Sequence, residues 1–412
     1  MSDPMHSLPE NLYSADQVRE LDRLAIEEHG IPAYTLMQRA AAFSYTSLKS
    51  CWPAAHTITV LCGGGNNAGD GYELARLAQK DNKQVTVINL FDPERLKGAA
   101  ADAYAAMLEC GVKPHAFSQE LLEQADVVVD AILGTGLDRD VEGELATVIE
   151  SLNSFDKPVL AIDIPSGLNA NTGQCMQVAV KADVTTTFIG LKKGMFTADG
   201  LQCSGNILFD MLDVPEVVYR ELGDAEAVRL QLGQMRQLLK PRAKNAHKGH
   251  YGHVLVVGGD AGYLGAARMA AEAAGRVGAG LVSVASRSAH AGLISSMRPE
   301  IMAHGVETLE ALMPLIQRAN VIAVGPGLGQ SDWARLLLAR VLESDLPLII
   351  DAAALSLPAE EPQAAAHWVI TPHPGEAARL LATDTMTIQA DRFKAAKALQ
   401  QKFHGPVVLE GS

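Results

Sequence analysis

Three glycine-containing segments in the first half of the chain carry residue types that could do chemistry. They are GGGNNAGDG (63–71), VDAILGTG (129–136) and DIPSG (163–167). The first follows a β-branched run and opens a helical pattern, which is the context of a loop that cradles a phosphate or another ligand. A tight strand–helix turn, with Gly and Asn at positive φ, would also explain it. Two adjacent Asn and an Asp exceed what a turn requires, so we favour ligand binding.

The other two segments each place an aspartate at the end of an expected strand. Asp163 could act as a general base or acid, and Ser166 with nearby carbonyl groups offers hard oxygen ligands for a cation. Asp130 stands at the end of the strand in the middle segment. Each aspartate could instead only cap the following helix. Because three such segments are expected at neighbouring strand ends, a joint site is more probable than three separate caps.

The elements that must position these residues alternate between strands and helices. Helices are predicted at Ser14–His29, with a capping box at Ser14 and Gln17, and at Tyr34–Ser50. In the first half, strand-forming runs follow at 57–63, 84–90, 125–136, 157–167 and 183–190. The alternation is interrupted at 215–246. It then resumes with strand-forming runs at 253–259, 281–286, 321–329, 346–355, 367–376 and 406–412. This alternation indicates βαβ units and parallel sheets. We therefore predict an α/β protein with two domains, 1–230 and 231–412.

Length, charge and cysteine content narrow the class of protein. The 412 residues exceed what one hydrophobic core usually serves. A net charge of −14 argues against nucleic acid and anionic membranes as partners. The five cysteines show no C-x-x-C spacing, which indicates free thiols in a reducing compartment. The sequence shows neither a secretory signal nor a membrane span, so we expect a cytoplasmic protein.

Several longer motifs resemble a known family. GNNAGDG, DAILGTGL, DIPSGLNANTG and FIGLKKG together resemble the NAD(P)HX epimerase domain. In the second half, KGHYGHVLVVGGDAGYLGAARMAAEAAGRVGAGLVSVA, GPGLG and TPHPGEAARLL resemble the ADP-dependent (S)-NAD(P)HX dehydratase. This order is that of the bifunctional NAD(P)HX repair enzymes. The resemblance implies a Rossmann-like three-layer domain followed by a ribokinase-like α/β domain that lacks its C-terminal part.

The resemblance also implies a substrate and cofactors. The substrate would be NADH or NADPH hydrated on the nicotinamide ring, in R and S forms. The first domain would interconvert the two forms with K⁺ bound. The second would dehydrate the S form with ADP, and could also use Mg²⁺. The family further implies a small-molecule substrate as the main partner and assembly as a homo-oligomer.

The same resemblance assigns roles to individual residues. Asp163 would be the catalytic carboxylate, and K⁺ would be held by Asn67, Asp130 and Ser166. In the epimerase domain the hydrate would also contact Asn66, Asn67, Ala68, Gly69, Asp70, Gly134, Thr135, Gly136, Leu137, Asp138, Arg139 and Asp140. In the dehydratase domain it would contact Ala266, Gly327 and His373, although His373 could equally be a turn residue. Glu410, Gly411 and Ser412 stand where the family binds ADP or AMP.

The sequence departs from the family pattern, mainly in its second half. Ala68 replaces a usual Gly, which the site should tolerate. DAAAL (351–355) replaces DADAL, and Glu410 replaces a Lys, so that attraction for phosphate becomes repulsion. The later G-x-G-D segment is missing. We therefore expect an active epimerase with an incomplete or inactive dehydratase. The alternatives are a non-catalytic nucleotide-binding or scaffold protein and a ribokinase-like small-molecule kinase.

Overall fold

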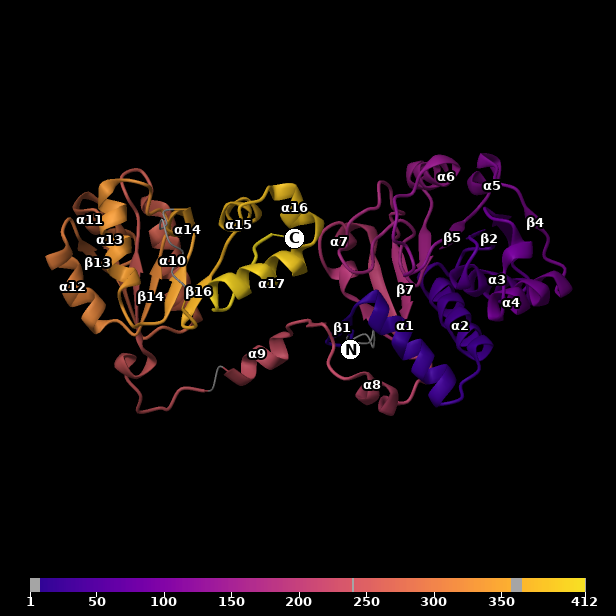
Figure 1. Cartoon of the computed structure of the whole chain (residues 1–412), viewed down its shortest axis with the longest axis horizontal. Coiled ribbons are helices and arrows are strands. Elements are labelled where there is room, and N and C mark those ends of the chain that lie inside the picture. The colour runs from indigo at the N-terminus through magenta and orange to yellow at the C-terminus, as the bar shows by residue number, and fades with distance from the viewer. Residues whose placement is uncertain (1–7, 239–240, 357–364, 412) are drawn as a thin grey trace. The chain divides into compact units, whose positions relative to one another are not determined.

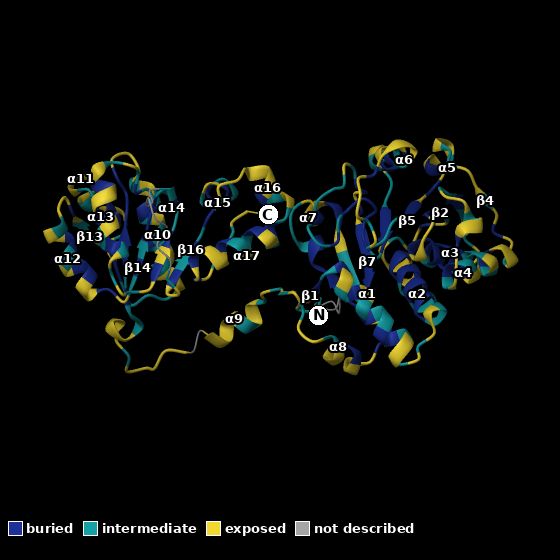
Figure 2. Ribbon diagram, viewed as in Figure 1, coloured by how far each residue is buried: buried dark blue, intermediate teal, exposed yellow. Residues whose placement is uncertain are grey.

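The computed structural model describes residues 8–238, 241–356 and 365–411 (Figure 1). The chain divides into two compact units, Met1–Leu238 and Leu239–Ser412. Each unit contains a parallel sheet with its own hydrophobic core. In Figure 2 the sheets are largely buried and the exposed residues follow the outer helix faces and the connections. Among these described residues, no helix is both long and apolar enough to cross a bilayer.

The first unit is built on a seven-stranded sheet with the order β4-β3-β2-β5-β6-β7-β9, in which every neighbouring pair is parallel. The central strands are nearly continuous runs of Val, Ile and Ala, as expected for strands covered on both faces. Within this sheet the chain first forms β2, then moves outward through β3 and β4, and returns to form β5 on the other side of β2. The order therefore reverses between β2 and β5, where a crevice for ligands is expected. The strands are β2 (Thr57–Cys62), β3 (Gln84–Asn89), β4 (Pro114–His115), β5 (Val127–Ala131), β6 (Val159–Ile162), β7 (Val184–Phe188) and β9 (Asn206–Asp210).

Helices cover both faces of this sheet and give it three layers (Figure 1). One face packs against α1 (Ala15–Arg23), α2 (Ala33–Cys51), α3 (Asn66–Lys80) and α4 (Ala99–Glu109). The other packs against α5 (Gln119–Glu123) and α6 (Gly143–Ser154). The remaining helical segments are η1 (Leu24–Glu28), η2 (Pro93–Arg95), η3 (Lys193–Phe196), α7 (Gly200–Cys203), α8 (Glu216–Leu222) and α9 (Leu232–Leu238).

Two local features position the start of the chain against the sheet. The predicted capping box is present, since the Ser14 hydroxyl accepts from the Gln17 backbone N–H and the Gln17 side chain accepts from the Ser14 N–H. A small second sheet has the order β10-β1-β8, with strands β10 (Ala227–Val228), β1 (Asn11–Tyr13) and β8 (Leu191–Lys192). It pairs Tyr13 with Lys192 and so fixes the backbone at Lys192.

The second unit has a six-stranded parallel sheet with the order β13-β12-β11-β14-β15-β16, which reverses between β11 and β14. The strands are β11 (His253–Val257), β12 (Leu281–Ser286), β13 (Met302–Gly305), β14 (Val321–Val324), β15 (Leu348–Ile350) and β16 (Trp368–Ile370). The helices are η4 (Lys248–Tyr251), α10 (Leu264–Val277), α11 (Ser288–Met297), α12 (Leu309–Arg318), α13 (Asp332–Leu342), α14 (Ala353–Ser356), α15 (Pro374–Leu380), α16 (Thr385–Ala390) and α17 (Arg392–Phe403). The sequence predicts a strand at 406–412. Residues 406–411, the described part of this range, form only an isolated parallel bridge, between Val407 and Ile370.

Candidate functional site

The loops that follow β2, β5 and β6 meet at the carboxyl edge of the first sheet. A Cβ atom added to Gly134 would lie 3.3 Å from Oδ2 of Asp163 and 3.5 Å from Cβ of Asn67. The Asn67 amide also donates to the carbonyl oxygen of Leu133 at 2.9 Å. Residues of all three glycine-containing segments are therefore neighbours. The parallel pairing of β2 with β5 and of β5 with β6 brings them together.

Asp130 and Ser166 form a buried pair between two of these loops. Both side chains are fully buried. The Ser166 hydroxyl donates to Oδ1 of Asp130 at 2.5 Å and the Ser166 backbone N–H donates to Oδ2 at 2.8 Å. Burial raises the pKa of Asp130 to about 6, while the hydrogen bonds from Ser166 act in the opposite direction. This pair joins the ends of β5 and β6, so it has a structural role whether or not a cation binds.

One buried oxygen at this place has no partner within the described part of the chain. Oδ1 of Asn67 is buried without a hydrogen bond, although the amide nitrogen of the same side chain is satisfied. An unsatisfied buried acceptor costs free energy unless a further ligand binds it. The neighbouring Asp130, Ser166 and Leu133 groups add further hard oxygen atoms, which suit an alkali cation. Over residues 8–238, 241–356 and 365–411 there is no cluster of three His, Cys, Asp or Glu side chains arranged to hold a metal ion.

Asp163 begins the loop after β6 in a left-handed backbone conformation. Its φ is +71°, which is uncommon for a residue with a side chain but tolerated best by Asp and Asn. Its backbone N–H still donates to the Thr186 carbonyl oxygen on β7 at 2.7 Å. The side chain is 19% exposed and forms an ion pair with Lys192 through Oδ1. The other carboxylate oxygen, Oδ2, faces Gly134.

Lys192 is a fully buried ammonium group that the sequence analysis did not assign. Besides Asp163, its Nζ donates to Oγ1 of Thr187 at 2.8 Å and to the carbonyl oxygen of Phe188 at 3.3 Å. Three protein acceptors match the three donors of an ammonium group. The motif FIGLKKG contains Lys192, and a lysine within an otherwise apolar strand segment is the pattern that could have marked it.

Two further carboxyl groups interact electrostatically with this ion pair. Burial raises the pKa of Asp22, on α1, to about 6. The positive charge of Lys192 opposes this rise, and the negative charge of Asp163 adds to it. Burial also raises the pKa of Asp70, on α3, well above its usual value, and both Asp163 and Asp22 contribute. The charge of Lys192 thus acts on three acidic side chains, those of Asp163, Asp22 and Asp70. Asp22 and Asp70 therefore hold their protons more tightly than usual, next to the ion pair between Lys192 and Asp163.

The other residues predicted to contact the hydrate in this unit differ in their positions. Asn66 is exposed at the first turn of α3, whereas Ala68 and Gly69 are buried. A Cβ on Gly69 would lie 2.9 Å from Cα of Ala100 and closer still to Met37. Packing of α3 against α2 and α4 therefore already explains this glycine. In the second loop Gly134, Thr135 and Leu137 are half-buried and Gly136, Asp138, Arg139 and Asp140 are exposed.

In the second unit the loops after β11 and β14 also meet at the point where the strand order reverses. A Cβ on Gly327 would lie 3.2 Å from Cβ of Ala266, so these two predicted contact residues are neighbours. Asp260 holds the two loops together. Its N–H donates to the Gly327 carbonyl oxygen at 2.7 Å and its carboxylate accepts from Ser331 at 2.5 Å.

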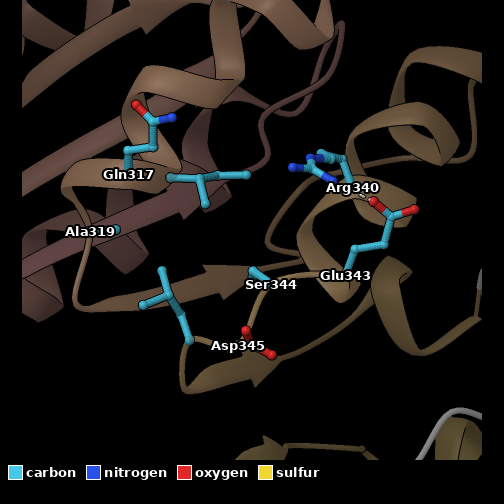
Figure 3. A pocket seen from close by; sticks show the side chains of 8 residues that line it. Gln317, Ala319, Arg340, Glu343, Ser344 and Asp345 are labelled. Atoms are coloured by element: carbon cyan, nitrogen blue, oxygen red, sulfur yellow. Dashed lines mark hydrogen bonds and ion pairs between the residues drawn. The ribbon is translucent and has the colours of Figure 1, made fainter.

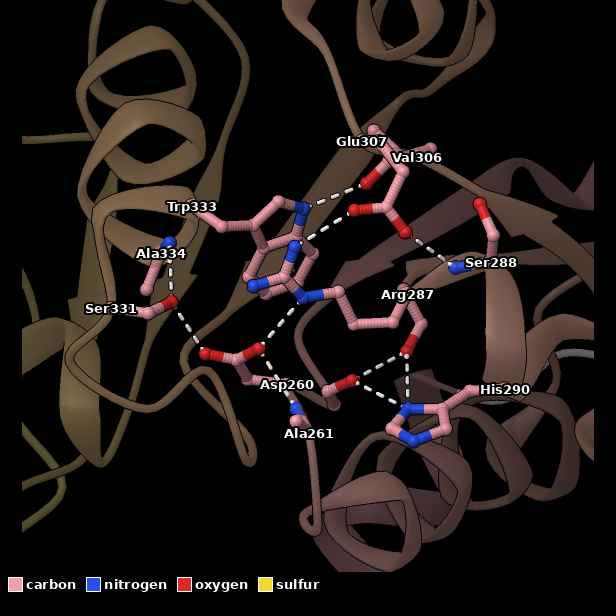
Figure 4. Close-up of polar contacts among 12 residues, drawn as sticks. Asp260, Ala261, Arg287, Ser288, His290, Val306, Glu307, Ser331, Trp333 and Ala334 are labelled. Atoms are coloured by element: carbon pink, nitrogen blue, oxygen red, sulfur yellow. Dashed lines mark hydrogen bonds and ion pairs between the residues drawn. The ribbon is translucent and has the colours of Figure 1, made fainter.

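A polar network surrounds Asp260 (Figure 4). Arg287 donates to Asp260 at 2.8 Å and to Glu307 at 2.8 Å, and its guanidinium lies 4.6 Å from the ring centre of Trp333. Burial acts to raise the pKa of Asp260, but hydrogen bonds from Ser331 and Arg287 hold it below its usual value. A charged, fully bonded carboxylate at this position makes the two loops rigid.

His373 and the end of the chain are placed next to one another. His373 caps α15, where its Nδ1 accepts from the Gly375 N–H at 3.0 Å, and its side chain is 52% exposed. The local structural role of His373, considered above as that of a turn residue, is thus that of a helix cap. The Glu410 N–H donates to the carbonyl oxygen of Pro372 at 3.0 Å, Gly411 is exposed, and Ser412 lies outside the described residues.

The described residues of the second unit line cavities at two places. One, of about 620 Å³, extends over apolar side chains of β11, β14 and β15 and reaches Asp351, Thr371 and Glu410. The other, of about 290 Å³, is lined by Gln317, Arg340, Glu343 and Asp345 among others (Figure 3). Its residues precede β14 and β15, at the amino edge of the sheet, whereas ligands of such sheets bind at the carboxyl edge. It contains none of the predicted site residues.

Comparisons with known proteins match both units. The family model described as YjeF-related protein N-terminus matches residues 33–194, and the one described as NAD(P)H-hydrate dehydratase matches residues 254–412. The bifunctional NAD(P)H-hydrate repair enzyme Nnr of Coxiella burnetii is 46% identical over 97% of this chain and 82% of that protein. The Escherichia coli protein of the same name is 39% identical over 98% of this chain and 78% of its own length.

A solved structure is also similar to part of this chain. It is the ADP/ATP-dependent NAD(P)H-hydrate dehydratase of Bacillus subtilis co-crystallised with ATP/Mg²⁺, at 29% identity and a TM-score of 0.35 over 42% of this chain and 62% of that one. The family match over 254–412 does not support the expectation of an incomplete or inactive dehydratase, which we correct here. Of the two departures, Ala353 begins α14 and Glu410 lies outside the named helices and strands, so both are local changes beside the six-stranded sheet.

Proposed function

Because the chain belongs to the family of bifunctional NAD(P)H-hydrate repair enzymes, we propose that its first unit interconverts the R and S forms of NAD(P)HX at the ends of β2, β5 and β6. The observation that carries this proposal is the position of Asp163. One of its carboxylate oxygens is held by Lys192 and the other faces Gly134, in the loop that the family resemblance assigns to the hydrate.

Inversion of the hydroxyl-bearing carbon requires its C–O bond to be broken and remade, or the ring to be opened and reclosed. Either route moves a proton on and off a hydroxyl or a ring nitrogen, which a positioned carboxylate can do. Lys192 binds one carboxylate oxygen of Asp163 and so fixes the orientation of this side chain. Since all three donors of Lys192 are used by protein oxygens, we assign it as a positioning residue and not as the acid.

We further propose that K⁺ is held by Asn67, Asp130 and Ser166. The buried, unpartnered Oδ1 of Asn67 and the neighbouring hard oxygen atoms support this assignment. When bound, the cation would supply a positive charge next to the hydrate. The residues themselves keep the loops after β2, β5 and β6 in contact.

For the second unit we propose removal of water from (S)-NAD(P)HX with ADP, and Mg²⁺ as the metal that accompanies the nucleotide. The hydrate would lie beside Ala266, Gly327 and His373, and the nucleotide near Glu410, Gly411 and Ser412. The contact between Ala266 and Gly327 and the placement of Glu410 beside the His373 loop support a single site. A cytoplasmic location and assembly as a homo-oligomer stay predictions.

One assay tests the epimerase proposal. Purified protein is given (R)-NADHX, and the S form is followed by chromatography with and without ADP and K⁺. We expect conversion of R to S without ADP, and its loss in Asp163→Asn. The exposed Asp102 on α4 provides a matched control, since Asp102→Asn removes the same charge away from the site. An Asp163→Asn protein as active as the Asp102→Asn protein would contradict the catalytic assignment. Binding of the hydrate without turnover would favour the scaffold alternative.

A further inference from the structure

Two cysteines of the first unit lie side by side although they are 28 residues apart in the sequence. The sulfur atoms of Cys175 and Cys203 are 3.7 Å from each other. Cys203 is the last residue of α7 and is buried, whereas Cys175 is partly exposed. Both lie in a small hydrophobic cluster with Leu168 and Met195, beneath the segment that follows Asp163. The pair belongs to none of the sites described above.

The backbone around the two thiols is already connected. The Cys175 N–H donates to the Asp199 carboxylate at 3.1 Å, and the Gly200 N–H donates to the carbonyl oxygen of Gly173 at 3.1 Å. These hydrogen bonds hold the two segments in register on one side of the sulfur pair. A disulfide bond of about 2.05 Å requires the sulfur atoms to approach by roughly 1.7 Å from their present 3.7 Å.

We propose that Cys175 and Cys203 form a reversible disulfide when the protein meets a small disulfide oxidant such as oxidised glutathione. Cys175 is the residue that solvent can reach. After losing its proton, it attacks one sulfur of the oxidant and releases one glutathione thiolate, which takes up a proton. Cys203 then loses its proton and attacks Sγ of Cys175, which expels the second glutathione. Two protein thiols are oxidised, and one glutathione disulfide is reduced to two thiols.

The cross-link would enclose the segment that contains Lys192. Residues 175–203 include β7, β8 and η3. The segment that precedes Cys175, residues 163–174, starts with Asp163. Closing this loop restricts the unfolded chain, so oxidation should raise the melting temperature of the first unit by roughly 5–10 °C. This inference does not depend on the proposed epimerase reaction, because neither thiol takes part in it.

The test uses the full chain, reduced and then incubated with oxidised glutathione. Free thiols are alkylated, and peptides are mapped by mass spectrometry without reduction. We expect a peptide that links Cys175 to Cys203, its disappearance on treatment with dithiothreitol, and the rise in melting temperature. Cys203→Ala should instead accumulate glutathione on Cys175 and show no rise in melting temperature. Cys110→Ser removes a half-buried thiol outside the pair and should form the link as the parent does.

Other outcomes would overturn the proposal. One is a parent protein that stops at the glutathione adduct on Cys175, as Cys203→Ala does. Another is a link that involves Cys51, Cys62 or Cys110 in place of the expected pair. Because Cys203 is buried, Cys175→Ser serves as a second variant in case Cys203→Ala does not fold, and it should take up no glutathione on Cys203. The mapping is read without any assay of NAD(P)HX, so failure of the proposed function would not affect it.

Discussion

Replacing Lys192 by Met tests whether the buried ammonium exists to hold Asp163. The methionine keeps the length and apolar stem of the side chain but removes the charge and the donors to Asp163, Thr187 and Phe188. Breaking a buried ion pair from one side usually costs about 3–5 kcal/mol. Because the Asp163 side chain is 19% exposed, water relieves part of that penalty, and we expect about 3 kcal/mol.

For a unit of this size, that loss corresponds to a decrease in melting temperature of roughly 6–12 °C. Epimerisation should fall by roughly 10²–10⁴-fold, mainly in kcat, since Asp163 loses the ion pair that orients its carboxylate for proton transfer. Scanning calorimetry and the (R)-NADHX assay measure the two effects separately. Lys192→Arg keeps the charge and should lose less activity than Lys192→Met.

A double variant gives the decisive comparison. Adding Asp163→Asn to Lys192→Met removes the carboxylate that was left without a counter-charge, so about half or more of the lost stability should return. If the double variant is no more stable than Lys192→Met, the ion pair is not the source of the loss and the reasoning is wrong.

Three further predictions concern single residues. The folded-state pKa of Asp22 is raised to about 6. The contribution of Asp22 to stability is therefore complete below about pH 4 and is lost as the pH rises through 6. Asp22→Asn should accordingly be more stable than the parent between pH 5 and 7.5, by at most about 3 kcal/mol in urea unfolding. Gly134→Ala places a methyl group 3.3 Å from Asp163 and should raise KM for the hydrate more than Gly136→Ala, whose methyl meets open space; equal effects would contradict the assigned geometry. Gly69→Ala forces a methyl against α2 and α4 and should lower stability by about 1–3 kcal/mol, and an unchanged melting temperature would show that packing does not explain this glycine.

The sequence alone was enough to predict the architecture. Alternating runs of β-branched and helical residues predicted the parallel sheets, and Ser14 and Gln17 predicted the cap of the first helix, because these are local properties of the chain. The motif order predicted the family, and the three glycine-containing segments were expected at neighbouring strand ends. Asp163 could be singled out because it directly follows a buried strand, and Asp130 because it is the one acidic residue near the end of another, and both patterns are visible in a linear sequence.

Tertiary structure alone decided which groups act on one another. The spacing of residues says nothing about whether Asp22 on the first helix and Asp70 on the third share the charge of Lys192, because that depends on the order of strands in the sheet. The same holds for Cys175 and Cys203, whose contact follows from the hydrogen bonds between their segments. Charge and contact act through space, and folding brings together groups that the sequence keeps apart.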